Sequence, residues 1–417
     1  MSRRITGLIL AALFPTLVAA QSTTAITARR MLDVRAGRMI DNPVIVIQGD
    51  RIVSVGTAAP AGVTPVNLGD VTLLPGFIDA HTHMTMEIAG NWAMRPVLET
   101  PIDAALRGVA NARKTLFAGF TTVREVGAAG GADVSLMNAI DAGRFPGPRI
   151  VPAREAIGIT GGHCDDTGFV PGVLENEPAI ADGVDAVIHA VRYQIKYGAK
   201  VIKVCATAGV LSFEGPVGAQ QLSDEELKAI VDEARRHGLK VAAHAHGADG
   251  ILAAVRAGVA SIEHGSMIND QAIALMKQKG TYLVPTTYLT DRIDMASLPP
   301  VIRAKAEAIL PLARENLKKA IRGGVKIALG TDAAVYPHGE NAHEFGALVD
   351  RGMSPLEALR AGTINDADLL GVDDRGELAP GKLADIVAVP GNPLEDIHVT
   401  ERVRWVMKGG VVVSSTP

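Results

Sequence analysis

Cysteine is almost absent from this 417-residue chain, which contains only Cys164 and Cys205. Two cysteines cannot build a disulfide-dense scaffold or a cysteine-rich structural zinc site. Neither sign of charge predominates. The formal net charge is only −4, which gives no indication of a broad nucleic-acid-binding surface. Beyond residue 20 no stretch is long and apolar enough to span a bilayer, and internal repeats are missing. The composition, 47% apolar and 21% charged, is that of a globular protein.

The N-terminal segment 1–20 is predicted to be a signal peptide. Residues 1–4 carry two arginines, residues 5–20 are almost wholly apolar, and Val18-Ala19-Ala20 supplies small residues before Gln21. A basic, an apolar and a small-residue region in this order are typical of a cleaved export signal. The alternative is a short buried helix. We expect an exported protein, periplasmic or secreted, that has no membrane association after removal of the signal.

The mature chain has β-rich ends and a middle in which strands and helices alternate. Short β-rich segments separated by turn-forming residues occur near both ends, at 26–34, 43–56, 66–74, 384–389 and 402–413. Between them we expect eight strands, at 74–83, 121–127, 149–163, 200–207, 240–246, 261–265, 282–288 and 326–332. Eight β/α alternations favour an α/β fold with a closed (β/α)8 barrel of the TIM type. The predicted domains are a barrel over 75–374 and a small β domain built from 21–74 and 375–417.

Histidines cluster at the ends of these predicted strands. Six of the 11 in the chain fall at C-terminal strand edges: His81, His83, His163, His244, His246 and His264. A barrel gathers these edges at the face where its loops build active sites. Neutral imidazole nitrogen is a good ligand for zinc and similar ions. His81 and His83 point the same way because they are two apart on one strand, so both can reach one ion.

Two charged residues interrupt or follow apolar strands. Lys203 lies within the apolar run 200–205, where a lysine is costly unless it is paired or chemically altered. Either it is salt-bridged or extends to solvent, or CO2 adds to its neutral amine and gives a carbamate that can bridge two metals. Asp332 follows the strand 327–331. It either caps a turn or helix, or ligates a metal and takes a proton from bound water.

Seven motifs distributed along the chain resemble the amidohydrolase superfamily. In order they are PGFIDAHTH, TTVREVG, VIKVCATAG, HAHG, IEHG, LGTDA and LAPGKLADIVAV. The likeness covers essentially the whole mature chain and is closest to the prolidase-like and Xaa-Arg dipeptidase-like branch, which includes ochratoxin-hydrolysing amidohydrolases. It implies a barrel with a small β-sandwich, two divalent metal ions, for which zinc is well suited, and a homo-oligomer. Relatives more often have Asp at the position of Glu125, which we interpret as part of the barrel structure.

The resemblance also assigns roles by position. His81 and His83 would bind the more buried metal, carboxylated Lys203 would bridge both metals, and His244 and His264 would bind the second one. Asp332 would bind the buried metal and act as the catalytic general acid/base. His163 and His246 would contact the free carboxylate of the residue that is released. The choice of His244 over His246 as a ligand depends on the resemblance alone.

These features predict an enzyme that hydrolyses an amide C–N bond in a small molecule or dipeptide. We expect dipeptides or N-acyl amino acids with a free C-terminal carboxylate and an apolar released residue such as Pro, Phe or Leu. Ochratoxin A, an amide of phenylalanine, belongs to this class. One alternative is a cyclic amide, imidazolone or lactone hydrolase on the same scaffold. Another is an exported metal- or ligand-binding protein without catalysis, which would have to lack a ligand or the catalytic acid.

Cys164 and Cys205 lie near the ends of adjacent predicted strands. An exported chain offers the setting for a disulfide, but we favour two ordinary small buried residues, since Cys205 alternates with Lys203 on one side of the strand. Tyr288, at the edge of the seventh strand, either lines the substrate pocket or has a packing role.

Overall fold

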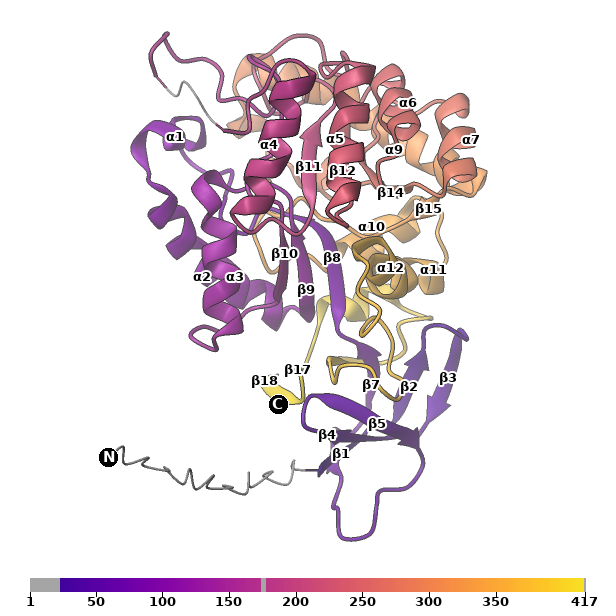
Figure 1. Ribbon diagram of the computed structural model, residues 1–417. Coiled ribbons are helices and arrows are strands. Elements are labelled where there is room, and N and C mark those ends of the chain that lie inside the picture. Colours follow the sequence, from indigo (N-terminus) through magenta and orange to yellow (C-terminus); the bar gives the residue numbers. More distant parts are fainter. Residues whose placement is uncertain (1–22, 174–177, 416–417) are drawn as a thin grey trace, which may run out of the picture.

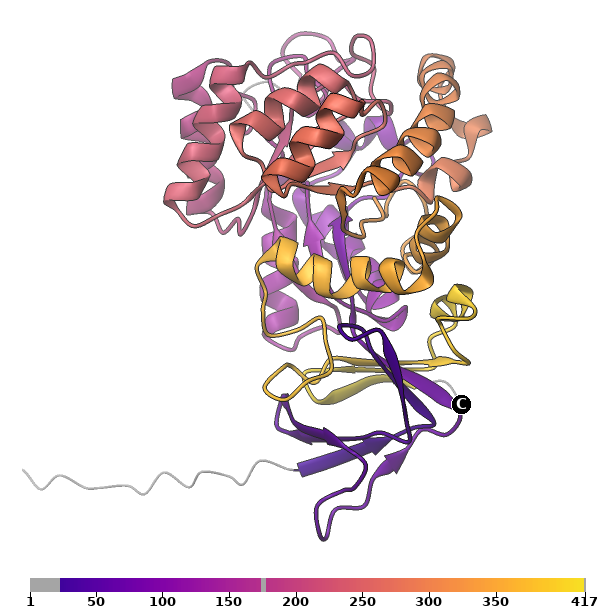
Figure 2. The same cartoon turned by 90° about the vertical axis from the view of Figure 1, so that its right-hand side faces the viewer.

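The computed structural model describes residues 23–173 and 178–415. The predicted signal peptide, 1–20, lies outside the described residues. Within them, none of the helices has the length and apolar character needed to cross a membrane. Two bodies are visible in Figure 1 and Figure 2, a helix-covered barrel and a smaller β domain at one end of it.

Eight parallel strands form the barrel in the described part of the chain, one at each predicted place. They are β8 (Phe77–Thr82), β9 (Phe120–Glu125), β10 (Arg149–Pro152), β11 (Ile202–Cys205), β12 (Val241–Ala245), β13 (Ser261–His264), β14 (Tyr282–Val284) and β15 (Lys326–Ile327). Strands β8 to β10 pair in one group and β11 to β15 in another. Backbone hydrogen bonds connect the two groups on both sides: Ile157 N donates to Lys203 O at 2.8 Å, and Asp332 N donates to His81 O at 2.8 Å. The predicted barrel is therefore confirmed.

Helices follow most of these strands and cover the outside of the barrel (Figure 1). The longer ones are α2 (Pro101–Phe117), α3 (Ala132–Asp141), α4 (Val184–Lys196), α5 (Asp224–Arg236), α6 (Ala248–Ala257), α7 (Asp270–Lys279), α9 (Pro300–Gly323) and α10 (His343–Asp350). Shorter ones are α1 (Arg95–Leu98), α8 (Leu289–Arg292), α11 (Pro355–Arg360) and α12 (Asp366–Leu370). Helix α5 begins at a capping box, in which the Ser223 hydroxyl accepts from Glu226 N and the Glu226 carboxylate accepts from Ser223 N.

The β domain is a sandwich of two sheets drawn from both ends of the described chain. One sheet has the order β5 (Arg51–Gly56), β4 (Val44–Gln48), β1 (Thr23–Thr27) and β6 (Val66–Asn67). The other has the order β18 (Val411–Ser415), β17 (Trp405–Lys408), β16 (Ile386–Pro390), β7 (Val71–Pro75), β2 (Arg30–Asp33) and β3 (Arg38–Asp41). Ile26 and Ile45 of the first sheet share an apolar core with Leu73, Ile386 and Trp405 of the second.

The chain passes from the sandwich into the barrel at Gly76, between β7 and β8. A Cβ atom at this position would lie 2.3 Å from the Thr121 hydroxyl oxygen, so only glycine lets the two strands approach this closely. Because β7 continues into β8, the sandwich directly supports the strand that ends in His81 and His83.

The third barrel strand is much shorter than predicted. It was expected over 149–163, but β10 ends at Pro152. Arg154 adopts the left-handed conformation, with φ of 64°, which interrupts the extended backbone. Three residues after Arg154, Ile157 still bridges Val204 of β11. His163 therefore lies in the loop after β10 and not at a strand edge, which corrects the prediction.

Candidate active site

A cavity of about 630 Å³ lies at the C-terminal ends of the barrel strands. Its walls include all the residues singled out from the sequence, namely His81, His83, His163, Lys203, His244, His246, His264 and Asp332. Apolar side chains such as Trp92, Leu289 and Leu310 line other parts of the wall. A concave site at this face, with convergent polar groups and apolar walls, is the usual form of a barrel active site.

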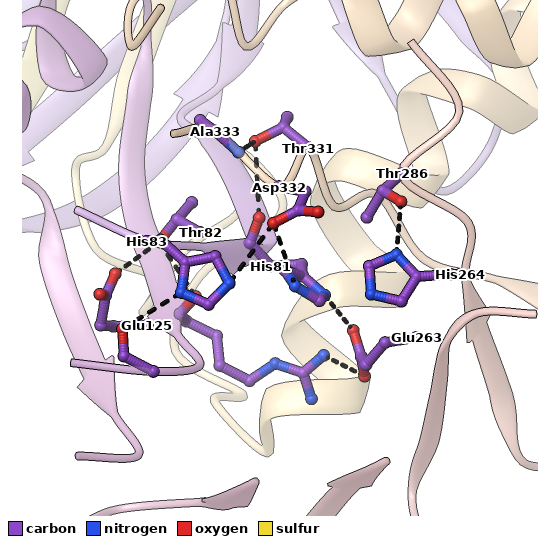
Figure 3. Close-up of polar contacts among 12 residues, drawn as sticks. His81, Thr82, His83, Glu125, Glu263, His264, Thr286, Thr331, Asp332 and Ala333 are labelled. Atoms are coloured by element: carbon purple, nitrogen blue, oxygen red, sulfur yellow. Dashed lines mark hydrogen bonds and ion pairs between the residues drawn. The ribbon is translucent and has the colours of Figure 1, made fainter. Parts of the chain in front are cut away.

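His81, His83 and Asp332 form a group that can hold a metal ion, since one potential ligand atom from each lies within 4.8 Å of the others. The Asp332 Oδ1 atom lies 3.6 Å from His81 Nε2 and 3.4 Å from His83 Nε2 (Figure 3). Asp332 has a φ of 58°, an uncommon conformation for a residue other than glycine. This backbone conformation, held by the Asp332 N bond to His81 O, brings the carboxylate to both imidazoles.

Three of the strand-end imidazoles are held by a second group at Nδ1. His81 Nδ1 donates to Glu263 Oε2 at 2.7 Å, and His83 Nδ1 donates to Gly127 O at 3.1 Å. His264 Nδ1 lies 2.8 Å from the Thr286 hydroxyl (Figure 3). Metal-binding histidines are typically oriented in this way, so that Nε2 carries the free lone pair.

Burial keeps these histidines neutral, which is the form that binds metals. The pKa values of His81 and His264 are held well below the usual 6.5, first by burial and then by neighbouring positive charge. Burial and the nearby charge of Lys203 lower the pKa of His83 to about 4. For the Asp332 carboxyl, burial acts in the opposite direction and raises the pKa to about 6.

Two further observations fit a metal centre. The Nε2 atom of His244 is buried and has no hydrogen-bond partner among the described residues, which leaves a costly unsatisfied group unless a ligand meets it. Lys203 is 4% exposed, and within the described ranges its side-chain amine makes no ion pair or hydrogen bond. Neither a lysine extending to solvent nor a salt-bridged one fits this environment. Burial lowers the pKa of Lys203 to about 8, so its amine is neutral in part near pH 8.

A buried ion pair behind His81 was not identified from the sequence as part of the site. Glu263, which orients His81, also accepts a hydrogen bond from Arg124 Nη2 at 2.8 Å, and both side chains are at most 2% exposed. The Ser261 hydroxyl donates to the same carboxylate. The sequence did contain a signal for this pair. Arg124 and Glu263 each place a charge in a strand predicted to be buried, and buried charges must be paired.

Glu125, the position that departs from relatives, makes structural contacts. Its Oε2 atom accepts from the Thr82 hydroxyl at 3.1 Å and from Met84 N at 2.6 Å. Burial raises the pKa of Glu125 well above its usual value. It braces the backbone around His83 without contacting either imidazole.

His163 and His246 flank His244 on the other side of the cavity. The ring of His163 stacks on that of His244 with centroids 4.1 Å apart, and the ring of His246 meets it edge-on at 4.6 Å. His246 Nδ1 lies 2.8 Å from the Ser266 hydroxyl. Both imidazoles are therefore placed beside the strand-end histidines without belonging to the His81–His83–Asp332 group.

Cys164 and Cys205 form a disulfide, with Cα atoms 5.8 Å apart. The preference for two unpaired buried cysteines is therefore wrong. The loop after β10 folds back over the end of β11, which brings the two residues together although 41 positions separate them. Tyr288 has the packing role: its ring stacks on His343 at 4.9 Å and meets Tyr336 edge-on at 5.0 Å.

Comparison with known proteins agrees with this architecture. Residues 72–413 match the model of the amidohydrolase family. The chain belongs to the amidohydrolase family. It is 37% identical over 363 residues to an ochratoxinase of Aspergillus niger, covering 81% of this chain and 75% of the relative. The expected family resemblance is thus confirmed, and the chain is an enzyme of the hydrolase class.

Two solved structures of the family are similar over nearly the whole chain. One is a Xaa-Pro dipeptidase with methionine bound in its active site, with a TM-score of 0.89 and 37% identity, covering 94% of this chain and 100% of the other. The second is a prolidase in complex with N-methylphosphonate-L-proline, with a TM-score of 0.85 and 33% identity, covering 95% and 100%. This amidohydrolase therefore lies close to ochratoxinase and to prolidase-like enzymes.

Proposed function

We propose that this amidohydrolase uses two divalent metal ions to cleave the amide bond of N-acyl amino acids or dipeptides with a free C-terminal carboxylate. The observation that carries the proposal is the convergence of eight polar residues on one cavity of about 630 Å³. The similarity to an ochratoxinase and to a Xaa-Pro dipeptidase supports an acyclic amide substrate. The apolar wall around Trp92, Leu289 and Leu310 favours an apolar released residue such as Pro, Phe or Leu.

In this proposal the donors divide into two sets. His81, His83 and Asp332 would hold the first ion, His244 and His264 would hold the second, and Lys203, if carboxylated, would be a ligand shared by both. This division is supported by the buried Nε2 of His244, which has no hydrogen-bond partner among the described residues, and by the burial of Lys203 between the two sets. Zinc suits a mixture of imidazole, carboxylate and carbamate ligands. When bound, the ions supply Lewis-acid polarisation of the carbonyl and a lower pKa for water.

Asp332 is the residue that moves the proton. Its carboxyl lies beside both imidazoles of the His81–His83 pair, where a carboxylate can accept a proton from the attacking water. Asp332 takes the proton of the attacking water and delivers it to the leaving amine. No other carboxylate of the cavity wall that the structure describes lies within 4 Å of both imidazoles.

His163 and His246 bind the substrate carboxylate. A carboxylate enclosed in the cavity must be paired, because leaving it unpaired costs several kcal/mol. The positions of the two rings on either side of His244 allow both to reach a group held next to the metals. They also favour this substrate class over cyclic amides and lactones that carry no carboxylate.

A screen of N-acyl amino acids and dipeptides, each with a free and an amide-capped carboxylate, tests the proposal by measuring the amino acid released. We expect the free substrates to be strongly preferred. His163→Ala or His246→Ala should lower kcat/KM for them about ten- to a hundredfold, the effect of a hydrogen bond to a charged group, with metal content unchanged. Equal cleavage of free and capped substrates would contradict carboxylate recognition and favour the cyclic-amide alternative.

We also propose export. The basic, apolar and small-residue pattern of segment 1–20 supports it, and so does the Cys164–Cys205 disulfide, because disulfides persist in oxidising compartments. Fractionation of producing cells should find a mature chain starting near Gln21 outside the cytoplasm. The homo-oligomer stays a prediction, to be checked by light scattering in solution.

A further inference from the structure

We propose that Ser212 and Glu214 are positioning residues that hold His163 for the substrate carboxylate. They lie in the loop between β11 and α5. This inference rests on the proposed function, because it assigns the cause of the orientation of a residue that the proposal already uses. It adds two residues that the sequence did not single out.

The contacts form a relay from carboxylate to imidazole. The Ser212 hydroxyl donates to Glu214 Oε1 at 2.6 Å, and His163 Nδ1 lies 2.7 Å from the same hydroxyl. A hydroxyl has one proton, which is directed to the carboxylate, so its oxygen accepts the Nδ1 proton of His163. Nε2 is then the edge of the ring left for a ligand, and no hydrogen bond from the described residues occupies it.

Glu214 stays ionised in this arrangement. Burial opposes its ionisation, but the nearby His163 imidazole and the hydrogen bonds from the Ser212 hydroxyl and the amide of Gly209 lower its pKa to about 2. Its Oε1 atom lies 3.4 Å from His163 Nδ1. The imidazole therefore has a fixed negative charge behind it, on the side away from Nε2.

The surroundings fix the loop and the ring in place. A Cβ atom at Gly209 would lie 2.2 Å from His163 Cε1, so the ring rests directly on the glycine. Lys305 of α9 donates to Ser212 O at 3.0 Å and also to Glu214 O, which ties the loop to that helix. On the other side, Gln221 accepts a hydrogen bond from His163 N at 3.0 Å.

One observation argues against a role in loop structure alone. Glu214 Oε2 is buried and has no hydrogen-bond partner among the described residues. If Glu214 only accepted the hydrogen bond from Gly209 N, its second buried oxygen would cost stability with no interaction to compensate. His246, by comparison, has only the neutral Ser266 hydroxyl at its Nδ1 atom. The charged relay is thus specific to His163.

Ser212→Ala, Ser212→Thr and Glu214→Gln test the inference in the metal-loaded enzyme, with free and amide-capped forms of one substrate. We expect Ser212→Ala and Glu214→Gln to raise KM for the free form about fivefold or more, the effect of one hydrogen bond, and to change kcat little. Neither should affect the capped form, and Ser212→Thr should restore the parent KM because it keeps the hydroxyl. Ser223→Ala removes a capping hydroxyl outside the cavity and is the matched control.

Two further measurements separate positioning from loop structure. Calorimetric binding of the released amino acid and of its amide gives a readout that does not depend on turnover, and elemental analysis should give unchanged metal content. Adding Ser212→Ala to His163→Ala should cause no further loss, since a positioning residue acts only through its partner.

The outcomes distinguish this inference from the proposed function. If the parent enzyme itself does not prefer the free carboxylate, the proposed function fails and this inference fails with it. If the parent does prefer it but the variants keep the parent KM, or lose the capped substrate equally, only the positioning role is wrong. An additional loss in the His163→Ala background would also overturn it.

Discussion

Replacing Glu263 by glutamine tests whether the buried ion pair behind His81 supports a metal site. Glu263 Oε2 accepts the Nδ1 proton of His81 at 2.7 Å, and glutamine keeps the shape but removes the charge. Loss of such an orienting partner typically weakens metal affinity about ten- to a hundredfold. We therefore expect zinc affinity to fall by about 1.4–2.8 kcal/mol, since each tenfold change is about 1.4 kcal/mol.

The same substitution should also destabilise the metal-free fold. Arg124 donates to Glu263 at 2.8 Å and is 2% exposed, so it would be left as an uncompensated buried charge. Breaking a buried pair from one side costs about 3–5 kcal/mol. A double variant, Glu263→Gln with Arg124→Met, removes both charges. It should regain much of the stability but none of the metal affinity, which separates the two effects.

Metal affinity is measured by titrating the metal-free protein with zinc against a chromophoric chelator, and stability by urea unfolding without metal. Glu125→Gln is the matched control, because Glu125 is an equally buried carboxyl on β9, the strand paired with that of His81, and contacts neither imidazole. Glutamine keeps a side-chain oxygen at this position that can accept from the Thr82 hydroxyl and Met84 N. Zinc affinity within twofold of the parent for Glu263→Gln, or an equal loss for Glu125→Gln, would refute the reasoning.

Three other predictions follow from the same geometry. If carboxylated Lys203 bridges two ions, Lys203→Ala should lose both bound metal, measured by elemental analysis, and activity. Lys203→Glu should keep some metal. A native-enzyme mass that corresponds to an unmodified lysine would contradict this prediction. Cys164→Ala with Cys205→Ala should cost about 4 kcal/mol of unfolding free energy for a closed loop of 41 residues, and should raise KM for free-carboxylate substrates with metal content unchanged, because His163 loses its neighbouring anchor. Unaltered kinetics after loss of the bond would show that it does not place His163. In the metal-free protein, burial lowers the pKa of His83 from 6.5 to about 4, so the unfolded chain takes up the proton first and stability falls as pH drops from 6.5 to 4. Urea unfolding at pH 5 and 7.5 should show a smaller difference for His83→Gln than for the parent.

The barrel strands could be predicted from the sequence because most contain a short apolar run, and several of these runs end at or just before a polar residue. Strands β8, β12 and β13 end at or beside histidines, and the rule that parallel strand ends meet at one face then places those histidines together. The strand β3 was missed because Arg38–Asp41 has charged residues at both ends and no buried position. This segment is a strand because it pairs with β2, and its own residues do not indicate one.

Residues that support the ligands were harder to predict than the ligands. Glu263 and Arg124 come from different strands, and only the register of the closed barrel brings their charges to 2.8 Å. The disulfide was misjudged for a similar reason. Alternation along β11 places Cys205 on the side of Lys203, but it does not reveal that the loop with Cys164 returns to that side.

His163 shows how far the sequence determines the rim of the site. The residue was identified, but it was placed at a strand edge, although the strand had already ended at Pro152. Its actual position depends on Arg154 breaking the strand, on the disulfide at Cys164, and on a serine and a glutamate from another loop. Strand ends in the barrel are fixed by a shared register, whereas these contacts depend on the lengths of two separate loops. Differences in substrate between this enzyme and its relatives are therefore expected at the loops that hold His163, while the histidines at the strand ends keep the same arrangement.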